Sequence, residues 1–121
     1  MKVNFCHICE MAFVSRDNNT LNIIRIFNRI HAQSLPAIQP RFFVVFNVSG
    51  VAGTYKYTIK ILDPDKVSIA NSDDGFTIQS PDSPAGILTE FVGLTFPKHG
   101  EYTMSLWVDG TEIDSIKLNI D

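Results

Sequence analysis

The sequence predicts an all-β protein, a two-sheet antiparallel β-sandwich of seven to nine strands. Apolar and polar residues alternate with a period of two along most of the chain, as they do in half-buried strands. Asp109-Gly110 separates two such runs, and this dipeptide is the strongest short signal for a hairpin. Segments rich in Pro, Gly, Asn and Asp recur at the intervals that a sandwich requires.

Length and composition indicate a single domain over residues 1–121. The formal net charge of −3 and the absence of a basic run argue against a nucleic-acid partner. No apolar run approaches the roughly 20 residues of a spanning helix, so no membrane partner is expected. The N-terminal stretch is too polar for a secretory signal, and two cysteines make no disulfide framework. We therefore expect a cytoplasmic protein.

Two strands are predicted in the middle of the chain. Arg41–Ser49 is apolar on both faces, which suits a strand in the middle of a sheet. Thr54–Leu62 alternates and predicts a half-buried strand. Between them, the short and glycine-rich segment Gly50-Val51-Ala52-Gly53 predicts a hairpin turn. On the first strand, one face should carry Phe42, Val44, Phe46 and Val48, and the other Phe43 and Val45.

The last two strands flank the Asp-Gly turn. Glu101–Val108 alternates regularly, with Trp107 on the face opposite to its large apolar residues. In Glu112–Ile120 the first apolar residue, Ile113, has an odd number, whereas the later ones, from Ile116 on, have even numbers, so they would lie on opposite faces of a regular strand. One extra residue near Asp114-Ser115 would restore the register, so a β-bulge is predicted there.

Further strands complete the prediction. Leu21–Ile30 also fits a helical period, but its isoleucines and the nearby Pro36 favour a strand. Asn71–Gly75 is predicted as a turn. The additional strands are Val3–Cys9, Leu21–His31, Val67–Ala70, Phe76–Gln79 and Ile87–Phe96. The expected core includes Phe46, Ile59, Ile61, Leu94, Met104, Leu106 and Leu118.

The segment Phe96–Tyr102 (FPKHGEY) resembles the turn that enters a late strand of an immunoglobulin-like domain. In that turn a tyrosine hydrogen-bonds back to the loop, and Tyr102 is the candidate here. The resemblance implies an immunoglobulin-like sandwich. Because no cysteine pair can link the sheets, the antibody branch is excluded.

A second resemblance extends over nearly the whole chain. The chain resembles a family of small bacterial proteins catalogued as a domain of unknown function, with no assigned activity, and so the resemblance implies no catalytic residue. Glu10 and Asn28 stand where aspartates are expected, so it implies no role for an acid at either position. The matching motifs are Cys9-Glu10, Leu21-Asn22-Ile23-Ile24, Ile26-Phe27-Asn28-Arg29-Ile30, Leu35-Pro36-Ala37, Asp63-Pro64-Asp65 and Phe96-Pro97.

Cys6-His7-Ile8-Cys9 has the spacing of a metal knuckle or a redox pair. On an extended strand, however, residues three apart point to opposite faces, so Cys6 and Cys9 could share neither an ion nor a disulfide. A buried strand is therefore favoured over a metal or redox role. One face should carry Val3, Phe5, His7 and Cys9, and the other Cys6 and Ile8.

Other signals for chemistry are weak. Phe96-Pro97-Lys98-His99 with Met104 echoes a blue-copper ligand loop, but a phenylalanine stands where the cysteine would be needed. Asp73-Asp74 could hold a weak calcium ion, but the spacing of a dedicated loop is missing. The three histidines are scattered, and no nucleophile motif occurs. We expect no enzyme activity, no cofactor and no required metal.

The sequence does suggest an interaction surface. Arg and Trp are enriched at the centres of interfaces, and the candidates are Arg25, Arg29, His31 and Trp107. The alternative is that the cations are merely solvated and that the indole packs under a neighbouring segment. We expect a protein-interaction or assembly module, with a two-fold homodimer covering Trp107 as one form of partner. The other function considered is a small-ligand binder with a pocket between the sheets or near Leu35–Pro40 and Ser80–Gly86.

Overall fold

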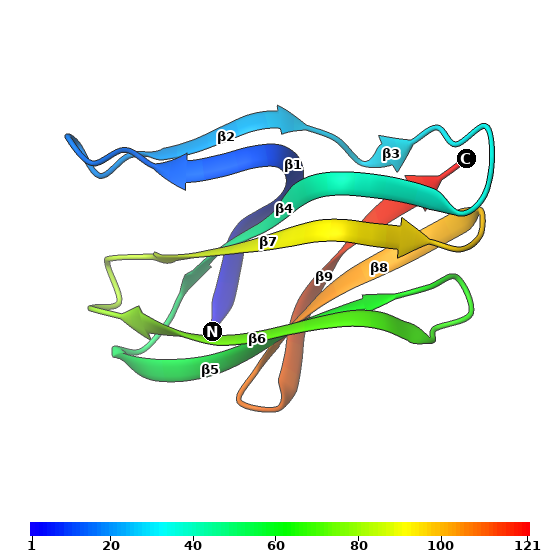
Figure 1. The fold of residues 1–121 in the computed structure, drawn as a ribbon. Helices are drawn as coiled ribbons and strands as arrows, with labels where there is room; N and C mark the ends of the chain where they lie inside the picture. The colour runs from blue at the N-terminus through cyan, green and yellow to red at the C-terminus, as the bar shows by residue number, and fades with distance from the viewer.

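The computed structural model describes residues 1–121, and its nine strands form two stacked sheets (Figure 1). The prediction of an all-β sandwich of seven to nine strands is therefore confirmed. The strands are β1 (Lys2–Val14), β2 (Leu21–Ile26), β3 (Arg29–Ile30), β4 (Ala37–Ser49), β5 (Gly53–Leu62), β6 (Ser68–Ile78), β7 (Ala85–Phe96), β8 (Gly100–Val108) and β9 (Thr111–Ile120).

One sheet has four strands in the order β2-β1-β4-β7, and the other has five in the order β3-β9-β8-β5-β6. All neighbouring strands are antiparallel except β3 and β9, which pair in parallel. Strand β2 lies at one edge of the four-stranded sheet and therefore has a strand partner on one side only.

Strand β4 is central and buried on both faces, as predicted. It pairs with β1 on one side and with β7 on the other. Its residues Phe42, Val44, Phe46 and Val48 belong to the main core between the sheets. Phe43 and Val45 face the other way, into a smaller second cluster formed with Cys9 and Ala12.

The second cluster exists because β1 changes its neighbour along its length. Up to Cys9 this strand pairs with β4, and from Cys9 onward it pairs with β2. Figure 1 shows β1 bending sharply where this change occurs. Leu21 and Ile23 of β2 pack against the second cluster, as does Leu88 of β7. One face of the β1–β2 hairpin therefore packs against the side of β4 and β7 that points away from the main core.

The predicted hairpin at Gly50-Val51-Ala52-Gly53 is wrong. Strands β4 and β5 belong to different sheets, so this segment connects the two layers. The physical reason is that both sides of β4 are already occupied by β1 and β7. Strand β5 instead pairs with β6 and β8.

Two other predicted boundaries differ from the structure. Leu21–His31 contains two strands rather than one, because the chain leaves β2 after Ile26 and crosses to the other sheet as β3. Asn71–Gly75 is part of the continuous strand β6 and not a turn. Its polar residues are tolerated because β6 is an edge strand, where the Asp73 carboxylate accepts a hydrogen bond from Thr58 Oγ1 at 2.5 Å.

The bulge in β9 is confirmed. Leu106 lies opposite Asp114 and Trp107 opposite Glu112, so the extra residue is Ile113, next to the predicted position. Six of the seven predicted core residues are fully buried, whereas Leu94 only packs against the edge of the core.

The predicted faces of β1 need one correction. A register shift between Val3 and Phe5 places Val3 against the main core together with Cys6. Regular alternation had placed Val3 on the other face with Phe5 and His7. The shift arises because Asn4 is an extra residue in this strand pair, and an extra residue reverses the parity of everything before it.

Candidate interaction site

The site begins where β1 separates from β4. The last pair between these strands is Cys9 with Phe43. Beyond it lies Pro40, which has no N–H to offer to a neighbouring strand. On the β7 side, Gly93 adopts a positive φ of 66° at the corresponding position. The pairing of β1 with β4 therefore ends here, while β4 continues to pair with β7, and the segment between β2 and β3 lies against β1 next to this point.

Backbone hydrogen bonds hold this crossing segment in place. The Phe27 N–H donates to the Ile8 carbonyl at 2.9 Å, which ties the segment to β1. The Asn119 N–H donates to the Asn28 carbonyl at 2.9 Å, which ties it to β9 of the other sheet. The crossing residues are thus fixed to both layers, and a hollow remains beside them.

This hollow, called the cleft below, has a volume of about 230 Å³. Phe27 and Ile30 form its apolar part and also pack against the main core. The full set of lining residues is Glu10, Arg25, Phe27, Arg29, Ile30, His31 and Gln39. Three of the four surface residues predicted from the sequence therefore meet in one place, although they come from different strands and a loop.

The ion pairs of the cleft are long. Arg25 Nε lies 3.5 Å from Glu10 Oε1, and Arg29 Nη1 lies 3.3 Å from Asp121 Oδ2. His31 Nδ1 lies 3.5 Å from the other oxygen of Asp121. Charge-assisted hydrogen bonds are usually about 2.7–2.9 Å long. The two guanidinium groups are therefore oriented by carboxylates without being tightly bonded, and their side chains are 73% and 63% exposed.

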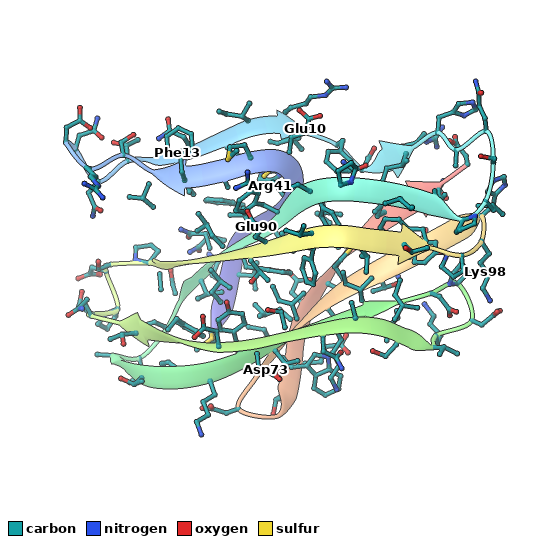
Figure 2. All side chains as sticks on the ribbon, viewed as in Figure 1. Glu10, Phe13, Arg41, Asp73, Glu90 and Lys98 are labelled. Atoms are coloured by element: carbon teal, nitrogen blue, oxygen red, sulfur yellow. The ribbon has the colours of Figure 1, made fainter.

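Arg41 on β4 provides the contrast. Its Nε and Nη2 both lie 2.6 Å from Glu90 Oε2, and its guanidinium carbon sits 5.4 Å from the centre of the Phe43 ring. Figure 2 shows Arg41 and Glu90 next to each other in front of the four-stranded sheet. This arginine is engaged within the protein, whereas Arg25 and Arg29 keep most of their donors available.

The backbone at Arg25 is unusual. Its φ is 58°, in the left-handed region that residues with a side chain rarely adopt. For an L-residue this conformation costs about 1–2 kcal/mol. The cost falls at the position on edge strand β2 that directs a cation to the cleft, and local strain of this kind is concentrated at functional sites.

An apolar strip lies beside the cleft and was not predicted from the sequence. It consists of Phe13 on β1 and Ile24 and Ile26 on β2, whose exposed fractions are 44%, 49% and 54%. In Figure 2 Phe13 projects from the β1–β2 hairpin. The sequence does contain a sign of this strip. Leu21–Ile26 has apolar residues at both odd and even positions, so both faces of the strand are apolar, and a surface hairpin can bury only one of them.

Trp107 lies elsewhere. It points away from the main core, as its parity predicted, and sits on the outer face of the five-stranded sheet. The Lys60 ammonium lies 4.0 Å from the centre of its ring, and its indole N–H donates to Ser105 Oγ at 3.1 Å. The indole is therefore partly covered by its own subunit.

The two cysteines lie on opposite faces of β1, as predicted. Cys6 packs against the main core and Cys9 is fully buried in the second cluster. Burial raises the pKa of both thiols, and the Asp114 carboxylate raises that of Cys6 further. Both are free and protonated at neutral pH, which makes them poor nucleophiles. No group of three or more His, Cys, Asp or Glu side chains is arranged to hold a metal ion.

A second charged cluster, called the turn cluster below, joins two turns at one end of the sandwich. The buried Asp63 accepts backbone hydrogen bonds from Asp65 and Val67 at 2.9 Å, and the ammonium of Lys98 contacts both Asp63 and Asp65. Tyr102, fully buried, donates its O–H to the Lys98 carbonyl at 2.8 Å. The predicted hydrogen bond from Tyr102 back to its loop is confirmed.

The segment that echoes a copper-ligand loop, Phe96–His99 with Met104, has a structural role. Phe96 and Met104 are buried in the main core, and His99 is exposed in the turn. The ring of Phe96 packs edge-on against Tyr102, with the centroids 5.0 Å apart. These residues therefore serve packing and the corner between β7 and β8.

The fold and the cleft define a nine-stranded β-sandwich protein with a cleft of paired charges and an apolar strip along one sheet edge. The chain belongs to DUF6941, a family of unknown function, whose model matches residues 4–121. No curated protein matches the sequence. The structure contains no helix with the length and hydrophobicity needed to cross a membrane.

Proposed function

We propose that the protein is a non-catalytic, immunoglobulin-like interaction module that binds a protein partner along the β2 edge. The observation that carries this proposal is the adjacency of the apolar strip and the cleft. On β2, the half-exposed Ile24 and Ile26 flank Arg25 of the cleft in the chain, and the half-exposed Phe13 of β1 pairs with Asn22 of the same strand.

This combination matches the anatomy of protein interfaces. Aromatic residues and arginine are enriched at interface centres, where they bury area and supply directional hydrogen bonds, and the strip and cleft offer Phe13 and two arginines. Strand β2 also has a partner on one side only, and an open sheet edge is a common place for protein contact.

The immunoglobulin-like part of the proposal is supported by the corner before β8. A tyrosine that hydrogen-bonds back to the preceding loop is typical of that class of sandwich, and Tyr102 makes this bond to Lys98. The two-layer antiparallel arrangement is compatible with it. A cytoplasmic location belongs to the same proposal, because the two unbridged cysteines suit a reducing compartment.

A small-ligand binder is less well supported. Ligand pockets usually enclose about 300–1,000 Å³ and are mostly apolar, whereas the cleft is smaller and lined mainly by polar and charged residues. Four other hollows, of about 370–520 Å³, are large enough, but three of them are also lined mainly by residues that are not hydrophobic. The two loops predicted to frame a pocket lie at opposite ends of β4, because Ala37 pairs with Phe96 and Val48 with Ala85. That predicted loop arrangement is wrong.

The decisive experiment compares two charge insertions on opposite edges of the same sheet. Ile26→Glu places a charge in the apolar strip, and Val92→Glu places one on β7, where the valine is 71% exposed. With tagged protein as bait in an extract of the source organism, Ile26→Glu should lose the partners that both the native protein and Val92→Glu retain. Equal capture by all three proteins would contradict the proposal.

Self-association through Trp107 is a second form of partner. The outer face of the five-stranded sheet carries this indole partly exposed, and a two-fold contact would cover it. Light scattering at high concentration should then give a dimer that Trp107→Glu converts to a folded monomer. A native protein that remains monomeric would rule out this form.

A further inference from the structure

Resting on the proposed function, we propose that the segment bound at the β2 edge is acidic. In this proposal Arg25 and Arg29 bind its carboxylates, and the apolar strip holds its apolar side chains. The partner chemistry is thus an extended protein segment in which acidic and apolar residues alternate.

The arginines of the cleft have free hydrogen-bond donors. A guanidinium group has five N–H donors, arranged to bind a carboxylate in a bidentate manner. In the cleft, each arginine has one carboxylate neighbour, at 3.3 or 3.5 Å. Arg41, in contrast, makes two contacts of 2.6 Å to Glu90. The cleft arginines can therefore accept an incoming carboxylate without breaking a short bond.

The net charge of the cleft favours a protein segment over a lone anion. With His31 neutral, Arg25 and Arg29 are balanced by Glu10 and Asp121. A small free anion would gain little from the overall field of such a site. A ligand that also buries apolar surface on the neighbouring strip gains from both contacts, which favours a protein segment over a lone anion.

The order of residues along the edge strand matches a segment of alternating acidic and apolar residues. Ile24, Arg25 and Ile26 follow each other on β2, so apolar, cationic and apolar residues succeed one another along the sheet edge. A complementary segment therefore has an acidic residue flanked by apolar ones. The Phe27 and Ile30 side chains, which line the cleft, extend the apolar contact beyond Arg25.

The proposal is tested by NMR titration of the full chain with a synthetic peptide of alternating glutamate and valine. The comparison ligands are the same peptide with glutamine for glutamate, glutarate, and inorganic phosphate. The acidic peptide should shift the backbone amides of Ile24, Ile26 and Arg29 in a saturable way. Arg29→Gln should weaken its binding about tenfold, as expected for the loss of one charged hydrogen-bonding group. Arg41→Gln is the matched control and should bind like the native protein.

Each other outcome overturns the inference. Equal binding of the glutamine peptide would mean that the acidic groups are not recognised, while the interaction function would remain supported by the loss of capture in Ile26→Glu. Equal binding of glutarate or phosphate would identify a small-anion site. If the β2 amide signals did not shift, or if Arg41→Gln weakened peptide binding as much as Arg29→Gln, the cleft would not be the binding site.

Discussion

The two charged clusters of this protein use similar residues for different ends. In the turn cluster, Asp63 is buried, accepts two backbone hydrogen bonds and contacts Lys98. In the cleft, Arg25 and Arg29 are largely exposed and lie more than 3 Å from their carboxylate neighbours. The Lys98–Asp63 contact is itself 3.5 Å long, so the two clusters differ in burial and in hydrogen bonds from the backbone. These two features, rather than the length of the ion pair, separate charges that hold the fold from charges that remain free for a partner.

The largest effect is expected at Gly100, where the turn cluster is closest packed. Its φ is 131°, and an added Cβ would lie 2.6 Å from Cγ of Pro64. Gly100→Ala should lower the free energy of unfolding by at least about 3 kcal/mol, since it adds overlap to backbone strain. Chemical denaturation followed by circular dichroism measures this.

Gly93→Ala is the matched control for that substitution. Gly93 has a φ of 66° with no atom within 4 Å of an added Cβ, so only the left-handed strain of about 1–2 kcal/mol remains. Equal losses in the two variants would show that the contact with Pro64 does not matter.

The next largest effect is expected from Tyr102→Phe. The hydroxyl donates to the Lys98 carbonyl and accepts from the Lys98 N–H, and its removal leaves both groups without this partner. A loss of about 1–3 kcal/mol is expected from denaturation curves. Tyr55→Phe removes a hydroxyl bonded to Val51 near the surface and should cost less. A larger loss of stability in Tyr55→Phe than in Tyr102→Phe would show that the hydrogen bonds of Tyr102 are not a main source of stability.

The turn cluster should also make stability depend on acid. Hydrogen bonds from the Val67 and Asp65 backbone, together with the Lys98 charge, lower the pKa of Asp63. A lowered pKa in the folded state stabilises the protein above the ordinary value of about 4, and this contribution is lost as the pH falls through the folded-state pKa. Native protein should therefore lose more stability than Asp63→Asn between about pH 5 and pH 2. Parallel curves for the two proteins would contradict this.

The smallest effect on stability is expected in the cleft. Arg25→Gly removes an exposed ion pair but relieves the positive φ, so stability should stay within about 0.5 kcal/mol of the native value. Arg41→Gly loses the short contacts with Glu90 and should cost about 2 kcal/mol. A clear loss of stability in Arg25→Gly would mean that the cleft, like the turn cluster, serves the fold.

Local patterns in the sequence determined most of the strands. The alternation of Thr54–Leu62 and Glu101–Val108, the Asp109-Gly110 turn and the bulge in β9 depend on residues that are neighbours in the chain, and the structure has all of them. The two apolar faces of Arg41–Ser49 likewise predicted a central strand. These features follow from the side-chain period of a strand, which sequence records directly.

Only the tertiary structure decided which strands pair and where the surface opens. Gly50-Val51-Ala52-Gly53 looks the same in sequence whether it closes a hairpin or joins two layers, and the choice depends on β1 and β7 having already occupied both sides of β4. The candidate surface residues Arg25, Arg29 and His31 were visible in the sequence, but their meeting in one cleft depends on where β1 leaves β4 and where the chain crosses from β2 to β3. Strand pairing is a competition among distant segments, and the period of a single strand carries no record of its outcome.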